Sequence, residues 1–363
     1  QVEELGAYGT NAPGALFHPR GLDFHTDRVL YIADTDNHRI QRYDAQNDVW
    51  LAPWGGPGTA AGEFDQPVDV DVDGAGNLYV ADLGNNRVQR RSPAGAWTVW
   101  GGTDPGSGLG EFWGPFGVVA DAAGNLYVAE HYNRRIQKRT AAGAWSEILS
   151  NGFADSQVRR PRSLEAEAGG TLLISDFRET SPENALIRRV DSSGALQATL
   201  LESPDGAGGI DKVGNLSLQG TNGLFAADMY GHVVRRYDFG AGTWDTIVDA
   251  GVLSGPEGLA WDGLGNLYIA DTGHHRILKL VVDADYVIQP LPVLAPLAGG
   301  GVTLGWPTQE NLFYDIEYTE DLLNAASWQP LPGCQGLPAT NGWLQCIDTN
   351  ANFGQRFYRI QAY

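Results

Sequence analysis

The sequence predicts an all-β protein, a six-bladed β-propeller followed by a small β-sandwich, on three observations. A unit of about 43 to 52 residues recurs six times within residues 1–286. Each unit holds four short apolar runs separated by turn-forming residues, which is the pattern of four antiparallel strands. Residues 301–363 lack this unit but continue in alternating, strand-length runs. One such unit cannot bury both of its faces, so six of them favour a closed ring.

The repeat is clearest in an apolar strand that ends in an acid. Its six copies are Tyr31–Asp34, Tyr79–Asp82, Tyr127–Glu130, Leu173–Asp176, Phe225–Asp228 and Tyr268–Asp271. In five units a proline starts the strand before it, at Pro19, Pro67, Pro115, Pro161 and Pro256. Gly-Asn or Asn-Gly pairs lie between these two strands, and they indicate hairpins because some tight turns need residues that tolerate positive φ.

The strand after each acid begins with arginine in four units. These arginines are Arg39, Arg87, Arg135 and Arg276, and the acids are Asp34, Asp82, Glu130, Asp176, Asp228 and Asp271. A residue type that recurs at the same position of every unit indicates structure rather than a single active site. We therefore expect ion pairs and hydrogen bonds that tie strand ends and neighbouring blades together.

The sixth unit lacks a fourth strand after Arg276–Leu280. The N-terminal residues Val2–Gly9 resemble the missing strand, since Leu5–Gly9 matches the pattern of Trp97–Gly101. We expect this segment to pair with the last blade and to close the ring.

The C-terminal part divides into a Pro-rich linker with a first strand, residues 287–300, and a sandwich, residues 301–363. Trp306, Tyr318 and Tyr358 are its expected core residues. The only two cysteines, Cys334 and Cys346, enclose a loop of about a dozen residues. We predict a disulfide between them, worth about 3 kcal/mol in the chain-entropy model.

These motifs resemble the NHL-repeat family over about residues 1–283. The similar features are a Gly-rich loop, Phe, Pro, a strand, Gly-Asn, Tyr-Val-Ala-Asp and Asn-His-Arg-Ile-Gln. Unit four departs from the pattern by an insertion at Phe177–Ala185, and unit five lacks the arginine. The C-terminal order of Trp306, Tyr-x-Ile-x-Tyr and Tyr-Arg-Ile-x-Ala resembles a fibronectin type III domain. The resemblance implies the fold and leaves the function open, because propellers host binding, scaffolding and catalysis.

Charge narrows the classes of partner. The net charge of −20 disfavours nucleic acid, which needs a basic surface. No run of 18 apolar residues is present, so we expect no membrane insertion.

The start at Gln1 and the cysteine pair favour a secreted protein, extracellular or at the cell surface, whose signal peptide has been removed. The tripeptide Asn215–Ser217 is a possible glycosylation site.

Two metal sites deserve consideration. Asp23, Asp71 and Glu165 each follow the unit's proline by four residues, and they could converge in the central channel around a cation such as Ca²⁺. His38, His232 and His275 each follow the repeat acid by four residues and suggest zinc, as in NHL-like lyases. Equivalent residues of adjacent blades lie on the order of 10 Å apart, whereas zinc binds nitrogen at about 2 Å, so this second site is disfavoured. We expect no other cofactor.

The sequence favours a non-enzymatic extracellular binding or scaffold protein. Its partner would be another protein or a further copy of the chain, joined through Val2–Gly9 or through an open edge of the sandwich. The alternative is a secreted propeller lyase or lactonase that uses a metal in the channel, as the resemblance to enzymes of this architecture implies.

Overall fold

The computed structural model describes most of the first 282 residues and separate strands after them. The described residues are 2–152, 154, 157–178, 184–204, 210, 212–248, 251–282, 293–296, 302–307, 313–319, 329–331, 334, 337–338, 343–348 and 357–362. The chain forms two compact units, Gln1–Asp262 with Leu267–Val281, and Gly263–Asn266 with Val282–Tyr363.

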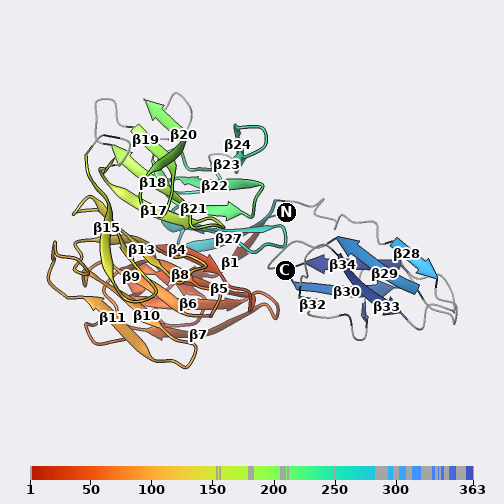
Figure 1. The fold of residues 1–363 in the computed structure, drawn as a ribbon. Coiled ribbons are helices and arrows are strands. Elements are labelled where there is room, and N and C mark those ends of the chain that lie inside the picture. The colour runs from red at the N-terminus through yellow and green to blue at the C-terminus, as the bar shows by residue number, and fades with distance from the viewer. Residues whose placement is uncertain are drawn as a thin grey trace. The chain divides into compact units, whose positions relative to one another are not determined.

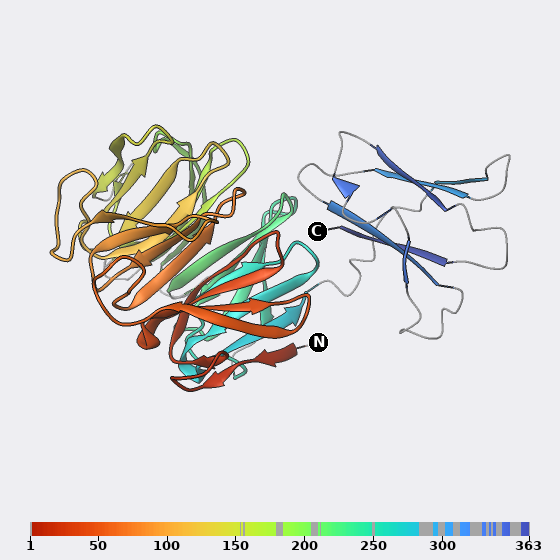
Figure 2. The same ribbon diagram turned by 90° about the horizontal axis from the view of Figure 1, so that it is seen from below.

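The first unit is a β-propeller of six four-stranded antiparallel blades (Figures 1 and 2). Blade one comprises β4 (Pro19–Phe24), β5 (Val29–Asp34), β6 (Arg39–Asp44) and β7 (Val49–Gly55). Blade two comprises β8 (Pro67–Val72), β9 (Leu78–Asp82), β10 (Arg87–Arg91) and β11 (Trp97–Gly101). Blade three comprises β12 (Pro115–Ala120), β13 (Leu126–Glu130), β14 (Arg135–Arg139) and β15 (Trp145–Asn151), with β16 (Gln157–Val158) added in parallel.

The other three blades follow the same order. Blade four comprises β17 (Pro161–Ala166), β18 (Leu172–Arg178), β19 (Asn184–Val190) and β20 (Leu196–Pro204). Blade five comprises β21 (Val213–Gln219), β22 (Gly223–Asp228), β23 (Val233–Asp238) and β24 (Thr243–Val248). Blade six comprises β25 (Leu259–Trp261), β26 (Asn266–Asp271), β27 (Arg276–Val281) and β1 (Val2–Leu5). The first strands of successive blades contact one another around the whole ring, so they line its central channel.

The N-terminal strand completes the last blade. β1 pairs antiparallel with β27, from Val2 opposite Leu280 to Leu5 opposite Ile277, and both views show them side by side (Figures 1 and 2). The pairing strand is shorter than the expected Val2–Gly9, because β2 (Ala7–Tyr8) turns away and pairs with β3 (Ala15–Leu16) instead.

Apolar side chains fill the space between neighbouring blades. Leu30 and Ile32 of β5 are fully buried in one cluster with Tyr268 of β26. The repeated Phe and Trp residues pack on each other: the ring centroids of Phe64 and Trp97 lie 5.6 Å apart, and those of Phe112 and Trp145 lie 5.4 Å apart. The unit is therefore stabilised mainly by burial at the joints between blades.

Two short 3₁₀ helices complete the described propeller. They are η1 (Thr35–Asn37) and η2 (Thr272–His274), and each follows the repeat acid of its blade. Among the described residues, no helix is long and apolar enough to cross a membrane.

The second unit contains seven described strands. They are β28 (Val293–Pro296), β29 (Val302–Pro307), β30 (Phe313–Thr319), β31 (Gln329–Pro330), β32 (Leu337–Pro338), β33 (Trp343–Asp348) and β34 (Phe357–Ala362). β29 lies between β28 and β33, and β30 pairs with β31, β32 and β34. Cys334 is buried. The side chains of Cys346, Trp306, Tyr318 and Tyr358 lie outside what is described, so the sandwich, its fibronectin type III character and the disulfide stay predictions.

Candidate functional site

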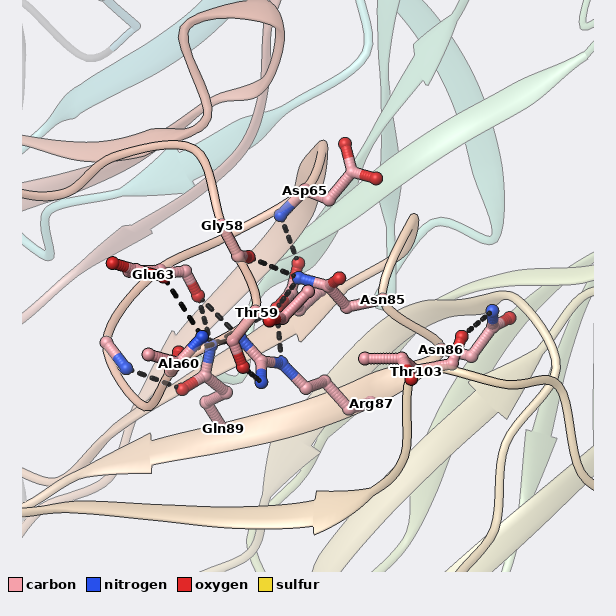
Figure 3. A network of polar contacts seen from close by, with 12 residues as sticks. Gly58, Thr59, Ala60, Glu63, Asp65, Asn85, Asn86, Arg87, Gln89 and Thr103 are labelled. Atoms are coloured by element: carbon pink, nitrogen blue, oxygen red, sulfur yellow. Dashed lines mark hydrogen bonds and ion pairs between the residues drawn. The ribbon is translucent and has the colours of Figure 1, made fainter.

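The repeated acids and arginines hold the loop that enters each blade. In blade two, Arg87 Nε lies 2.7 Å from Asp82 Oδ2, and the same guanidinium donates to the carbonyls of Thr59, Ala60 and Glu63 (Figure 3). Asp82 Oδ1 accepts the backbone N–H of Asp65 at 2.7 Å. Matching pairs join Arg39 to Asp34 at 2.8 Å, Arg135 to Glu130 at 2.5 Å and Arg276 to Asp271 at 2.8 Å. These acids and arginines therefore form their hydrogen bonds and ion pairs within the propeller itself.

Blade four makes the same bond from a different position. Leu186, not arginine, lies opposite Asp176 in the strand pairing. Arg188, two residues further on, places Nη2 3.3 Å from Asp176 Oδ2 and donates to the Gln157 carbonyl at 2.6 Å. Other blades have glutamine at this position, such as Gln89. Sequence reasoning missed Arg188 because the insertion changes the spacing, and only the strand register reveals the equivalence.

The three histidines after the acids also join neighbouring blades. Each adopts a left-handed backbone conformation, with φ between 53° and 57°. Each Nδ1 accepts a backbone N–H from the loop that enters the next blade: His38 from Gln66 at 3.1 Å, His232 from Gly255 at 2.8 Å and His275 from His18 at 3.2 Å. The histidines therefore serve three separate joints and do not converge on one ion.

Two sets of bonds cross the central channel. Arg162 Nη2 of blade four lies 3.0 Å from Glu257 Oε2 of blade six, and Arg20 Nε lies 3.5 Å from the other oxygen of Glu257. Deeper in the channel, Asn215 of blade five donates to Asp69 Oδ1 of blade two at 2.9 Å. Asn215 Nδ2 is engaged in this bond, and the possible glycosylation of Asn215 stays a prediction.

A small cavity lies beside the Asp69–Asn215 bond. It measures about 30 Å³, and its lining includes Asp23, Asp69, Asp71 and Glu165. This volume holds one or two water molecules. Asp23 Oδ2 accepts the N–H of Val72 at 2.6 Å, and Asp71 Oδ2 accepts that of Ala120 at 2.9 Å. Both aspartates thereby tie their blade to the next one.

Burial controls the protonation of these acids. It raises the pKa of Asp23 to about 6 and that of Asp69 to about 7, although backbone hydrogen bonds oppose the change. Burial and the charge of Asp23 raise the pKa of Asp71 and of Glu165 well above their usual values. The cluster therefore retains protons near neutral pH.

The predicted cation ligands come together but do not form a chelating group. Asp23, Asp71 and Glu165 share the cavity, yet no three His, Cys, Asp or Glu side chains in the described part of the chain are placed to hold one metal ion. Two of the three carboxylates already accept backbone N–H groups. A Ca²⁺ ion needs six to eight oxygen ligands, so this arrangement does not support the calcium hypothesis.

The end of the channel where the first strands begin is chemically different. We call it the mouth. It comprises Arg20, Phe116 and Arg162 on the first strands, Glu257 just before β25, and Trp113, His131, Tyr132, Lys212 and Tyr230 on the surrounding loops. The Arg162 guanidinium lies 4.3 Å from the Phe116 ring centroid, and the His131 ring lies 5.5 Å from the same ring. Burial, with the charges of Arg162, Arg160 and Lys212, lowers the pKa of His131 to about 3. The imidazole is thus neutral at pH 7.

Three aromatic side chains of the mouth face solvent. Trp113, Tyr132 and Tyr230 are 47%, 55% and 59% exposed. Trp113 and Tyr132 lie together, with ring centroids 5.7 Å apart, and Lys212 Nζ donates to the Tyr230 hydroxyl at 3.2 Å.

Three of the mouth residues are departures from the repeat. Tyr132 and Tyr230 follow the repeat acid by two residues, where units two and six have Gly84 and Gly273. Lys212 immediately precedes the first strand, where unit six has Gly255. Sequence reasoning considered the positions that recur in the repeat and so overlooked Tyr132, Tyr230 and Lys212. Aligning units three to five with the other units would have identified these residues as differences from the repeat.

The chain contains NHL repeats built into a six-bladed β-propeller. The NHL repeat model matches residues 18–43, 64–90 and 253–280, in blades one, two and six. No curated protein matches the sequence.

Among solved structures, a streptogramin B lyase is 14% identical, with a TM-score of 0.54, over 77% of this chain and 96% of its own. Virginiamycin B lyase from Staphylococcus aureus is 15% identical, with a TM-score of 0.54, over 77% and 99%. A structural genomics protein of unknown function from Bacteroides thetaiotaomicron is 14% identical, with a TM-score of 0.59, over 77% and 74%. At these identities the likeness concerns the fold alone.

Proposed function

We propose that this protein is a non-enzymatic binding protein that presents the mouth of its propeller to a partner. One contrast carries the proposal. Polar residues that recur in the blades are engaged in bonds within the ring, whereas the aromatic residues Trp113, Tyr132 and Tyr230 are exposed at one end of the channel. Two of them, Tyr132 and Tyr230, stand where units two and six have glycine. Exposed rings that gather at one place typically mark an interaction site.

The closed channel supports binding at the surface rather than passage through the ring. Arg162 and Glu257 engage each other across the channel, and Asn215 and Asp69 do so further along. Both bonds join blades that are not neighbours, so they also make the ring a rigid support. Rigid presentation of aromatic side chains lowers the entropy that binding costs.

A location outside the cell is part of the proposal. A disulfide between Cys334 and Cys346 would persist in an oxidising compartment and be reduced in the cytosol. In that setting the propeller would act as a binding module, and the C-terminal unit would tether it to a surface or to a further subunit.

Site-specific photocrosslinking tests the proposal. A photoreactive residue at Tyr132, exposed to the extracellular fraction of the source organism, is expected to give one discrete adduct. The same residue at Val49, which is 45% exposed on β7, serves as the control and is expected to give none. No adduct at either position, or equal adducts at both, would reject the mouth as the binding surface.

The second candidate is a propeller lyase or lactonase. Fold similarity to streptogramin B lyases favours it, as does Glu165, whose raised pKa suits a proton donor. Stoichiometric metal in the purified protein, together with metal-dependent turnover, would favour this candidate over the first.

A further inference from the structure

We propose that the mouth recognises a segment of a partner protein in which carboxylate side chains alternate with apolar ones. This inference rests on the proposed binding function and specifies the chemistry of the partner. Three features of the mouth support it: its positive charge, its exposed rings and a carboxylate that it already holds.

The first feature is a local reversal of charge. The whole chain carries a net charge of −20. At the mouth, however, Arg162 and Lys212, with the neighbouring Arg160, lie near enough to His131 to lower its pKa, and Arg20 similarly acts on Arg162. Such a patch attracts an acidic segment, while the acidic surroundings repel ligands that cannot place their charge at the mouth.

The second feature is the set of exposed rings beside these charges. Trp113 and Tyr132 form a pair on blade three, and Tyr230 lies on blade five with Lys212 Nζ 4.8 Å from its ring centroid. Trp, Tyr and Arg are the residues that most often dominate binding energy at protein interfaces. The rings offer contact area to apolar side chains that flank the carboxylates.

The third feature is Glu257, which acts as an internal model of the ligand. Its carboxylate binds Arg162 and Arg20 at 3.0 and 3.5 Å. Arg162 is held against Phe116, so its guanidinium is fixed before a ligand arrives. Glu257 therefore shows that the mouth accommodates a carboxylate, and it also competes with any carboxylate that a partner brings.

Charge balance favours carboxylates over a nucleic acid. A phosphodiester chain carries one negative charge per nucleotide along its whole length. Beyond the mouth it would meet a strongly acidic protein, whereas a short acidic segment can place a few charges at the mouth and end there.

Fluorescence anisotropy with the full-length protein tests this inference. The probe is a fluorescein-labelled peptide of alternating glutamate and phenylalanine, compared with a glutamine–phenylalanine peptide. We expect the acidic peptide to bind about tenfold more tightly, and Trp113→Ala or Lys212→Gln to weaken its binding about tenfold. Glu257→Gln is expected to tighten binding, because it removes the competing carboxylate. Asp245→Asn, the same change of charge at an exposed position on β24, is the control and is expected to have no effect.

Three results would overturn the inference. One is equal affinity for the two peptides, and another is acidic-peptide binding that is unchanged by Trp113→Ala and Lys212→Gln. The third is tighter binding of a single-stranded oligonucleotide that these substitutions abolish. Photocrosslinking at Tyr132 distinguishes the two proposals, since a discrete adduct without preference for acidic peptides would retain the binding function and reject only the acidic partner.

Discussion

Carboxyl groups at equivalent positions of the first strands have different surroundings. Asp23 and Asp71 each accept a backbone N–H from the next blade. Glu165 occupies the same position in blade four, and no described residue donates a hydrogen bond to it. Burial without a donor favours the protonated form, so the fold disfavours the charged form of Glu165.

Replacing Glu165 with glutamine should change how stability depends on pH. The raised pKa means that the folded chain keeps a proton which the unfolded chain releases above about pH 4.5. The free energy of unfolding therefore falls as pH rises from there through the folded pKa. Urea unfolding at a series of pH values should show Glu165→Gln to be more stable than the natural protein at about pH 8 and similar to it at about pH 5.

Asp245→Asn provides the matched control, since it removes one carboxyl group from an exposed position on β24. The control should leave the slope between about pH 5 and 8 as it is in the natural protein. A slope that Glu165→Gln also leaves unchanged would contradict the assignment of a raised pKa to Glu165.

Sequence alone revealed the residues that recur and missed those that meet across the ring. The acids and arginines of the blades are evident from their spacing, and so is the sharing of one channel position by Asp23, Asp71 and Glu165. The Arg162–Glu257 pair joins residues 95 positions apart in blades that are not adjacent. No pattern in the chain specifies such a pair, because it depends on the radius of the closed ring.

At the scale of elements, the first strands of neighbouring blades approach closely. Pairing of the first strand with the second is irregular just after its first residue in blades one to five. Near this irregularity, small residues allow the backbone of one blade to approach that of the next blade. At Gly258 an added Cβ would lie 1.7 Å from the Arg20 carbonyl oxygen.

Gly258→Ala should therefore destabilise the propeller. The new methyl group overlaps the backbone of blade one, which cannot move without disturbing the ring, and we expect a loss of about 3 kcal/mol in the free energy of unfolding. Gly74→Ala is the control, because a Cβ at Gly74 meets nothing within 4 Å. Similar unfolding midpoints in urea for the two variants would contradict this account of the blade six to blade one joint.

At the scale of the whole molecule, the ring is closed by a strand from the opposite end of the sequence. The resemblance of Leu5–Gly9 to other fourth strands predicted this closure, but the predicted strand was too long. The local pattern does not show that β1 ends at Leu5 and that β2 pairs elsewhere. The segment Val2–Leu5 is short and mostly exposed, with only Leu5 buried. It is suited to exchange with a neighbouring copy, which is one route to rings or filaments.

Deletion of residues 1–9 tests this route. We expect the full-length protein to form regular assemblies in negative-stain electron microscopy and light scattering, and the deletion to abolish them. The truncated protein should also melt at a lower temperature, because β27 loses its partner, and a synthetic peptide of residues 1–9 should restore part of the loss. Persistence of assemblies without these residues would exclude strand exchange, and a full-length monomer would exclude self-assembly.

The pairing of β1 with β27 also determines how the ring responds to pulling. Val2 lies opposite Leu280, so the N-terminal segment and the chain leaving β27 emerge at the same end of the ladder. Tension between the N-terminus and the C-terminal unit would load the hydrogen bonds one after another, as in a zipper, instead of shearing them together. A tethered propeller would therefore open at this seam under low force while its other five blades stay intact.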